Sequence, residues 1–120
     1  MATFYHVTNR ENVKAILRDG IAGGWGDDGF GVYVYTDLGD AESYAARNGW
    51  DGELEDPVIL EIEAPERDLD FIEINPEWPN PEDYENVRRF PMDPDEKAGL
   101  ENWHPGDIRL LEDQEPGPAV

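Results

Sequence analysis

The chain has 120 residues, 29 of them acidic and nine basic, so its formal net charge at pH 7 is −20. It contains no cysteine, which excludes a disulfide framework and thiolate chemistry. No apolar run approaches the roughly 20 residues of a membrane-spanning helix, and the first residues lack a basic segment followed by an apolar one. We therefore expect a cytoplasmic protein without membrane contacts.

Hydrophobic residues make up 38% of the chain and recur in periodic blocks. This pattern predicts a folded domain and not a disordered chain. A chain of this length supports one domain. We expect that domain to span residues 1–112, with 113–120 as a flexible tail.

The acidic surplus has two open explanations. Carboxylates are spread over every expected element, and Lys14 and Lys97 are the only lysines, a pattern of halophilic proteins. Such a surface suits concentrated salt, where charges are screened over about 3 Å. The alternative is an acidic DNA mimic that blocks a nucleic-acid-binding protein. Direct binding to nucleic acid is not expected, because phosphate contacts need clustered Lys and Arg.

The first elements in chain order are a strand and a helix. Residues 3–8 (TFYHVT) have the composition of a short buried strand. Thr8 and Glu11 have capping-box spacing for a helix that ends at Gly20. A glycine-rich loop is expected over residues 22–29.

A second strand and helix follow. Residues 32–36 (VYVYT) are β-branched and aromatic, which predicts a strand. Asp37 or Gly39 then opens a helix that closes at Asn48 and Gly49.

The second half of the chain is mostly strands and loops. Strands are expected at 57–64 (PVILEIEA), 69–74 and 108–111, with a proline-punctuated loop at 75–82 and a short helix at 83–90. The order of strand, helix, strand, helix and then mostly strands predicts an α+β fold with a small, mostly antiparallel sheet.

Several common sites are excluded by the sequence. The glycine-rich loop has no GKS or GKT ending, so it is not a P-loop, and residues 27–29 (DDG) lack the ligand pattern of an EF-hand. His6 and His104 are the only histidines, too few for a His-rich metal site. Ser43, the only serine, lies in an expected helix without a glycine elbow.

A set of polar and aromatic residues remains: His6 and Thr8 on the first strand, Tyr33 on the second, and Tyr44 on the helix that follows. In this order and spacing the chain resembles the ADP-ribosyltransferase fold, in particular its His-Tyr-Glu branch, which includes the diphtheria-type toxins. The resemblance spans residues 4–64. It implies a split antiparallel sheet with two or three short helices, and NAD bound as the substrate between two half-sheets.

The resemblance also implies roles for these residues. His6 would hydrogen-bond a ribose hydroxyl of NAD, with Thr8 nearby, while Tyr33 and Tyr44 would hold the nicotinamide ring. This chemistry is physically sound, because a neutral imidazole orients a hydroxyl and phenol rings stack on a flat cationic ring. Each residue also has a structural explanation, as a hydrogen-bonded strand histidine, strand packing or a helix anchor.

The catalytic glutamate of that branch lies shortly upstream of a Pro-x-x-Ile segment, which residues 105–108 match. Glu101 is then the candidate that stabilises the ribosyl cation, and Glu96 is the second candidate. Residues 97–99 (KAG) do not resemble a strand, and Glu101 is also explained as a solvated loop acid. Whether the glutamate is Glu101, Glu96 or absent stays open at this point.

The expected function is that of an NAD-dependent mono-ADP-ribosyltransferase-like enzyme that transfers ADP-ribose to a protein, a nucleic acid or a small molecule. One alternative is a catalytically degenerate module of the same fold that acts through protein contacts, as an accessory or viral structural protein does. The acidic DNA mimic is the other.

Overall fold

The structure is a computed structural model that describes residues 2–26, 29–49, 52, 54–78, 81–92 and 102–111. The expected tail at 113–120 lies outside them. Within the described ranges, no helix is long and apolar enough to cross a membrane.

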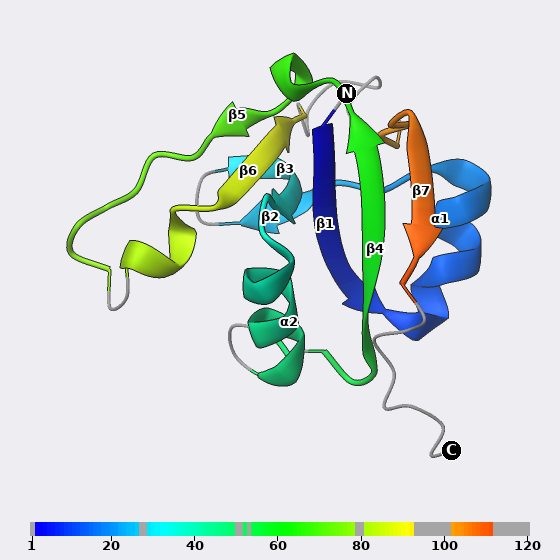
Figure 1. The fold of residues 1–120 in the computed structure, drawn as a ribbon, viewed down its shortest axis with the longest axis horizontal. Helices are drawn as coiled ribbons and strands as arrows, with labels where there is room; N and C mark the ends of the chain where they lie inside the picture. Colours follow the sequence, from blue (N-terminus) through cyan, green and yellow to red (C-terminus); the bar gives the residue numbers. More distant parts are fainter. Residues whose placement is uncertain are drawn as a thin grey trace.

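Strands and short helices alternate along the chain (Figure 1). The strands are β1 (Ala2–Asn9), β2 (Gly24–Gly26), β3 (Gly29–Tyr35), β4 (Pro57–Ala64), β5 (Asp70–Phe71), β6 (Val87–Pro91) and β7 (Asp107–Leu110). The α-helices are α1 (Val13–Asp19) and α2 (Leu38–Ala46), and the 3-10 helices are η1 (Arg10–Asn12), η2 (Glu66–Asp68) and η3 (Pro81–Tyr84).

All strand pairs between these elements are antiparallel. The strands lie in the order β5-β6-β3-β1-β4-β7, with β2 attached to β3 as a hairpin. This confirms the predicted α+β class and its mostly antiparallel sheet. The first strand of the chain is thereby central, with β3 on one side and β4 on the other.

The sheet carries a hydrophobic cluster on each face. On one face, Val32 and Val34 of β3 pack with α1, and on the other face Tyr33 and Tyr35 pack with α2. This division follows from the strand geometry, since successive side chains point to opposite faces. The sheet therefore lies between the two α-helices, and we call its sides the α1 face and the α2 face.

The imperfect alternation in β4 has a simple cause. Leu60 and Ile62 are fully buried on the α1 face, while Ile59 is buried on the α2 face. A strand with neighbours on both sides and a helix over each face is buried on both faces, so its sequence is apolar on both.

The predicted second helix is confirmed together with its ends. The Asp37 side chain accepts a hydrogen bond from the Asp40 backbone N–H at 3.1 Å, which is an N-cap. Beyond the helix, Asn48 and Gly49 have positive φ angles of 59° and 93° and stop it.

Two local predictions near the first helix are wrong. Thr8 does not cap that helix, because β1 continues to Asn9 and η1 precedes α1. The Thr8 hydroxyl oxygen instead accepts from the Asn12 side chain. The loop expected at 22–29 contains β2, which its hairpin pairing with β3 makes a strand.

The short helix expected at 83–90 is also wrong. A 3-10 turn ends at Tyr84, and Val87–Pro91 is strand β6, which pairs with β3 and β5. The strand expected at 69–74 shortens to the two residues of β5. Pairing between distant segments decides both outcomes, and local pattern does not report it.

Candidate functional site

The first strand pairs with β4 over a longer ladder than with β3. The β1–β4 ladder runs from Ala2–Ala64 to Asn9–Pro57, whereas β1 and β3 are in register at Tyr5–Tyr35. The β1–β3 pair joins β1-β4-β7 to β3-β6-β5 within one sheet. Figure 1 shows β1, β4 and β7 side by side, with β6 running at an angle to them.

His6 adds a side-chain bond between β1 and β3. Its Nδ1–H donates to the backbone carbonyl oxygen of Tyr33 at 2.9 Å, next to the Tyr5–Tyr35 pair. A carbonyl only accepts, so this bond fixes the tautomer and leaves Nε2 as the acceptor of the neutral ring. Burial lowers the pKa of His6 below its ordinary value, and the bond to Tyr33 opposes that shift. The ring is therefore neutral near pH 7.

A pocket of about 270 Å³ lies beside His6 on the α1 face. Ile16 and Ile21 supply apolar wall, and His6, Thr8, Asn12, Asp19 and Asn102 supply polar groups. Nitrogen and oxygen donors and acceptors thus gather in a cavity large enough for a sugar-sized group.

Thr8 and Asn12 are connected inside this pocket. The Asn12 Nδ2–H donates to Thr8 Oγ1 at 3.1 Å. Thr8 is 8% exposed, so its hydroxyl is a buried polar group whose remaining proton needs an acceptor. Sequence reasoning selected Thr8 but missed Asn12, although the four-residue spacing across a strand-to-helix junction is visible in the sequence.

The segment of Asn102 and Trp103, which follows the candidate glutamates, closes the pocket. The Asn102 Nδ2–H donates to the backbone carbonyl oxygen of Asp19 at 3.0 Å, one of the free carbonyls at the end of α1. Trp103 pairs with Ile21 and stacks on Phe90 at 4.8 Å between ring centroids. This segment is therefore fixed against both α1 and the core. Sequence analysis assigned it no binding role.

The predicted glutamates, Glu101 and Glu96, lie outside the described residues. Asn102, the next residue after Glu101, lines the His6 pocket. The catalytic role of either glutamate thus stays a prediction.

The two predicted tyrosines lie on the α2 face. Tyr33 donates its hydroxyl to the Gly29 carbonyl oxygen at 2.6 Å, and Tyr44 packs its ring on Tyr35 with 5.7 Å between centroids. Both belong to the cluster on that face. The structure therefore brings His6 and Thr8 together in one pocket and places Tyr33 and Tyr44 on the other side of the sheet.

The histidine and the first tyrosine still meet where β1 pairs with β3. Although its side chain is on the α2 face, Tyr33 offers its backbone carbonyl to His6. Among the residues that the structure describes, no group of three or more His, Cys, Asp or Glu side chains is placed to hold a metal ion.

Comparison of the chain with protein-family models, with curated proteins and with solved structures finds no match. The functional argument for this chain therefore rests on its own residues.

Proposed function

We propose that the chain is an NAD-dependent mono-ADP-ribosyltransferase-like enzyme with an ADP-ribosyltransferase-like split sheet. The observation that carries the proposal is His6, a neutral imidazole held by the Tyr33 carbonyl beside a polar pocket. This is the arrangement that binding a ribose hydroxyl requires: a fixed acceptor nitrogen in a partly dehydrated cavity.

In this proposal NAD binds where β1 pairs with β3. Its adenosine-side ribose lies against His6 and Thr8 in the pocket, and its nicotinamide ring extends toward Tyr33 and Tyr44. The pairing of β1 with β3 at Tyr5–Tyr35 supports this placement, because a ligand bound there would be near side chains of both faces.

The reaction breaks the bond between nicotinamide and the ribose C1′ and joins C1′ to an acceptor nucleophile. Nicotinamide leaves with the bond's electron pair, the acceptor loses its proton, and no oxidant or reductant is needed. A carboxylate stabilises the cationic C1′ as it forms. Glu101 is the proposed carboxylate, with Glu96 as the second candidate.

Nicotinamide release in molar salt tests the proposal. We expect release by the wild type and a loss of at least about 100-fold in Glu101→Gln. Tyr33→Ala and His6→Ala should lower turnover while Ser43→Ala, a change on the exposed side of α2, should not. No release by the wild type at any salt concentration would contradict an enzymatic function.

A non-enzymatic module of the same fold is the second candidate. The packing of Tyr33 and Tyr44 into the α2-face cluster favours it, because there both rings already have a structural role. This candidate predicts that the Tyr33→Ala variant loses stability and that the wild type releases no nicotinamide.

A surface adapted to concentrated salt belongs to the same proposal. Exposed carboxylates occur on both helices and on several strands, including Asp19, Glu42, Glu63, Asp70 and Asp107. A DNA mimic needs two rows of carboxylates on one face. This spread favours the adapted surface over the mimic.

A further inference from the structure

The direction of one hydrogen bond determines what the His6 pocket recognises. Asn12 donates its amide N–H to Thr8 Oγ1, so the Thr8 proton points away from Asn12. Among the described residues nothing else bonds to the Thr8 hydroxyl, and Thr8 lines the pocket. Thr8 is therefore available as a donor to a ligand.

His6 supplies the complementary group. Its Nδ1–H is used by the Tyr33 carbonyl, which leaves Nε2 as an acceptor, and no described residue bonds to Nε2. His6 and Thr8 are two residues apart on β1, so their side chains leave the same face of the strand about 7 Å apart. The pocket thus offers one donor and one acceptor at a spacing that the two hydroxyls of a diol bridge.

The charge of the pocket defines the ligand further. Asp19 is the ionised side chain in its lining, and neither Lys nor Arg is part of that lining. The Asp19 carboxylate is already paired with Arg18 at 2.8 Å, so the lining offers no cation to a phosphate ester, whereas an uncharged sugar hydroxyl needs none.

We propose that Asn12 is a positioning residue: by donating to Thr8 it makes the pocket specific for an unmodified sugar diol, of which one hydroxyl donates to His6 and the other accepts from Thr8. This deepens the proposed function, on which it rests, by assigning the pocket to the neutral ribose and not to the phosphates of the dinucleotide.

Reversing the bond is the direct experiment. The carboxylate of Asn12→Asp only accepts, so the Thr8 proton turns toward it and Thr8 presents an acceptor to the pocket. The probe is adenosine, an uncharged ribonucleoside, with binding measured by calorimetry in molar salt. We expect a loss of affinity of about 10-fold in Asn12→Asp and in Thr8→Val, and a smaller loss in Asn12→Ala.

Two controls separate positioning from charge and from folding. Lys14→Gln changes the net charge by the same amount on the exposed side of α1, outside the pocket, and should leave affinity within about twofold. In the Thr8→Val background, Asn12→Asp should cause no further loss, because Asn12 acts through the Thr8 hydroxyl. Thermal melting of every variant checks that it is folded.

The possible results are distinct. An equal loss from Asn12→Asp with and without the Thr8 hydroxyl, or no loss in either, overturns the positioning role. Binding of adenosine but not of NAD by the wild type supports the role of the pocket and contradicts the proposed function. Binding of neither ligand overturns both.

Discussion

At the residue scale, His6 is the side chain with the most constrained chemistry. One ring nitrogen joins β1 to β3 through the Tyr33 carbonyl, and the other is left for the pocket. A structural histidine needs the first bond, whereas a binding histidine needs both nitrogens. The structural and the binding explanation of His6, both open from the sequence, therefore differ in whether Nε2 has a ligand as its partner.

The lowered pKa of His6 predicts a pH dependence of stability. As pH falls below about 6.5, the unfolded chain protonates this ring before the folded chain does. The unfolded state then binds more protons, so His6 makes stability fall from pH 7 toward pH 5, by at most about 1.4 kcal/mol per pH unit. Above pH 7 this contribution is absent.

Denaturant unfolding from pH 5 to 8 in molar salt measures this effect. His6→Asn keeps an N–H for the Tyr33 carbonyl and loses the titration, so its stability should fall less steeply on acidification. The carboxylates titrate in both proteins, so their contribution cancels in the difference between the two stability curves. Parallel curves for the two proteins would show that His6 titrates as an exposed histidine does.

Gly20 is the second constrained residue. Its φ is 87°, and a Cβ there would lie 2.6 Å from the Trp103 carbonyl oxygen and 2.8 Å from the His104 ring. We predict that Gly20→Ala lowers the free energy of unfolding by about 1–3 kcal/mol and loosens the pocket wall. Gly24→Ala, at a site with no atom within 4 Å, is the matched control and should cost less. Equal thermal melting of the two variants would contradict the close approach.

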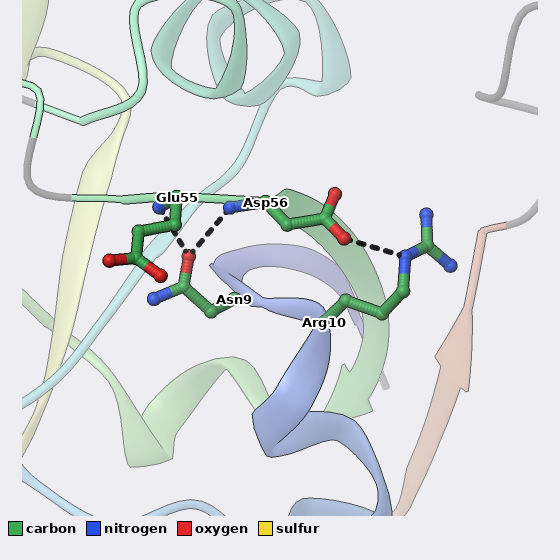
Figure 2. A network of polar contacts seen from close by, with 4 residues as sticks. All are labelled: Asn9, Arg10, Glu55 and Asp56. Carbon is green, nitrogen blue, oxygen red and sulfur yellow. Dashed lines mark hydrogen bonds and ion pairs between the residues drawn. The ribbon is translucent and has the colours of Figure 1, made fainter.

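At the element scale, the end of β1 holds the loop that leads into β4. Figure 2 shows Asn9 Oδ1 accepting from the backbone N–H groups of Glu55 and Asp56, at 2.9 and 3.2 Å. Arg10 adds a bond from its backbone N–H to the Asp56 carbonyl oxygen and a pair with the Asp56 carboxylate at 3.2 Å. Both side chains of the ion pair are substantially exposed, so the backbone bonds carry most of the stabilisation.

Asn9→Ala should therefore free the two N–H groups and cost about 0.5–1.5 kcal/mol. Hydrogen exchange should become faster at Glu55 and Asp56, while exchange in the middle of β4 stays slow. Asn9→Asp keeps the acceptor oxygen and should restore protection. Unchanged exchange at both amides in Asn9→Ala would show that other contacts hold the loop.

The elements that the sequence predicts are those with a strong local pattern. The strands at 3–8, 32–36 and 57–64 are confirmed because alternating or continuous apolar residues report burial directly, and the Asp37 cap and Asn48-Gly49 stop mark α2. In contrast, β6 depends on pairing with β3 and β5, and its Arg-rich sequence gives no local signal.

The residues of the candidate site also fall into those that a local sequence pattern predicts and those that it does not. His6 and Thr8 occupy alternate positions of one strand, so their common pocket follows from the strand period. The two-residue period of a strand also puts Tyr33 on the opposite face of the sheet from Val32 and Val34. It does not predict which helix covers each face. The contribution of Asn102 required the folded chain, since a segment far along the sequence closes the pocket, whereas the four-residue spacing of Asn12 from Thr8 is visible in the sequence.

At the scale of the whole molecule, the charge of −20 opposes the compact state. Salt screens repulsion between exposed carboxylates, with a screening length that falls to about 3 Å at 1 M. We predict that molar KCl raises stability by about 1–2 kcal/mol over dilute buffer, or roughly 5–10 °C in melting temperature for a domain of this size. A melting temperature that is constant or falls with KCl would contradict a salt-adapted surface.

The same charge acts on the ligand. NAD is anionic, so its binding should strengthen as salt is added, whereas binding of uncharged adenosine should change little. Comparing the two ligands across a KCl series by calorimetry separates electrostatic repulsion from effects of salt on the fold. Affinity for NAD that falls steadily with KCl would contradict this account.

The measurement that tests the central claim most directly is the ¹⁵N NMR signal of the His6 ring during titration with NAD in molar salt. The account predicts that the Nε2 signal shifts as a ribose hydroxyl donates to it, while the Nδ1 signal stays that of a protonated nitrogen bound to the Tyr33 carbonyl. Ring signals that do not move at saturating NAD would contradict the claim that His6 is a binding residue.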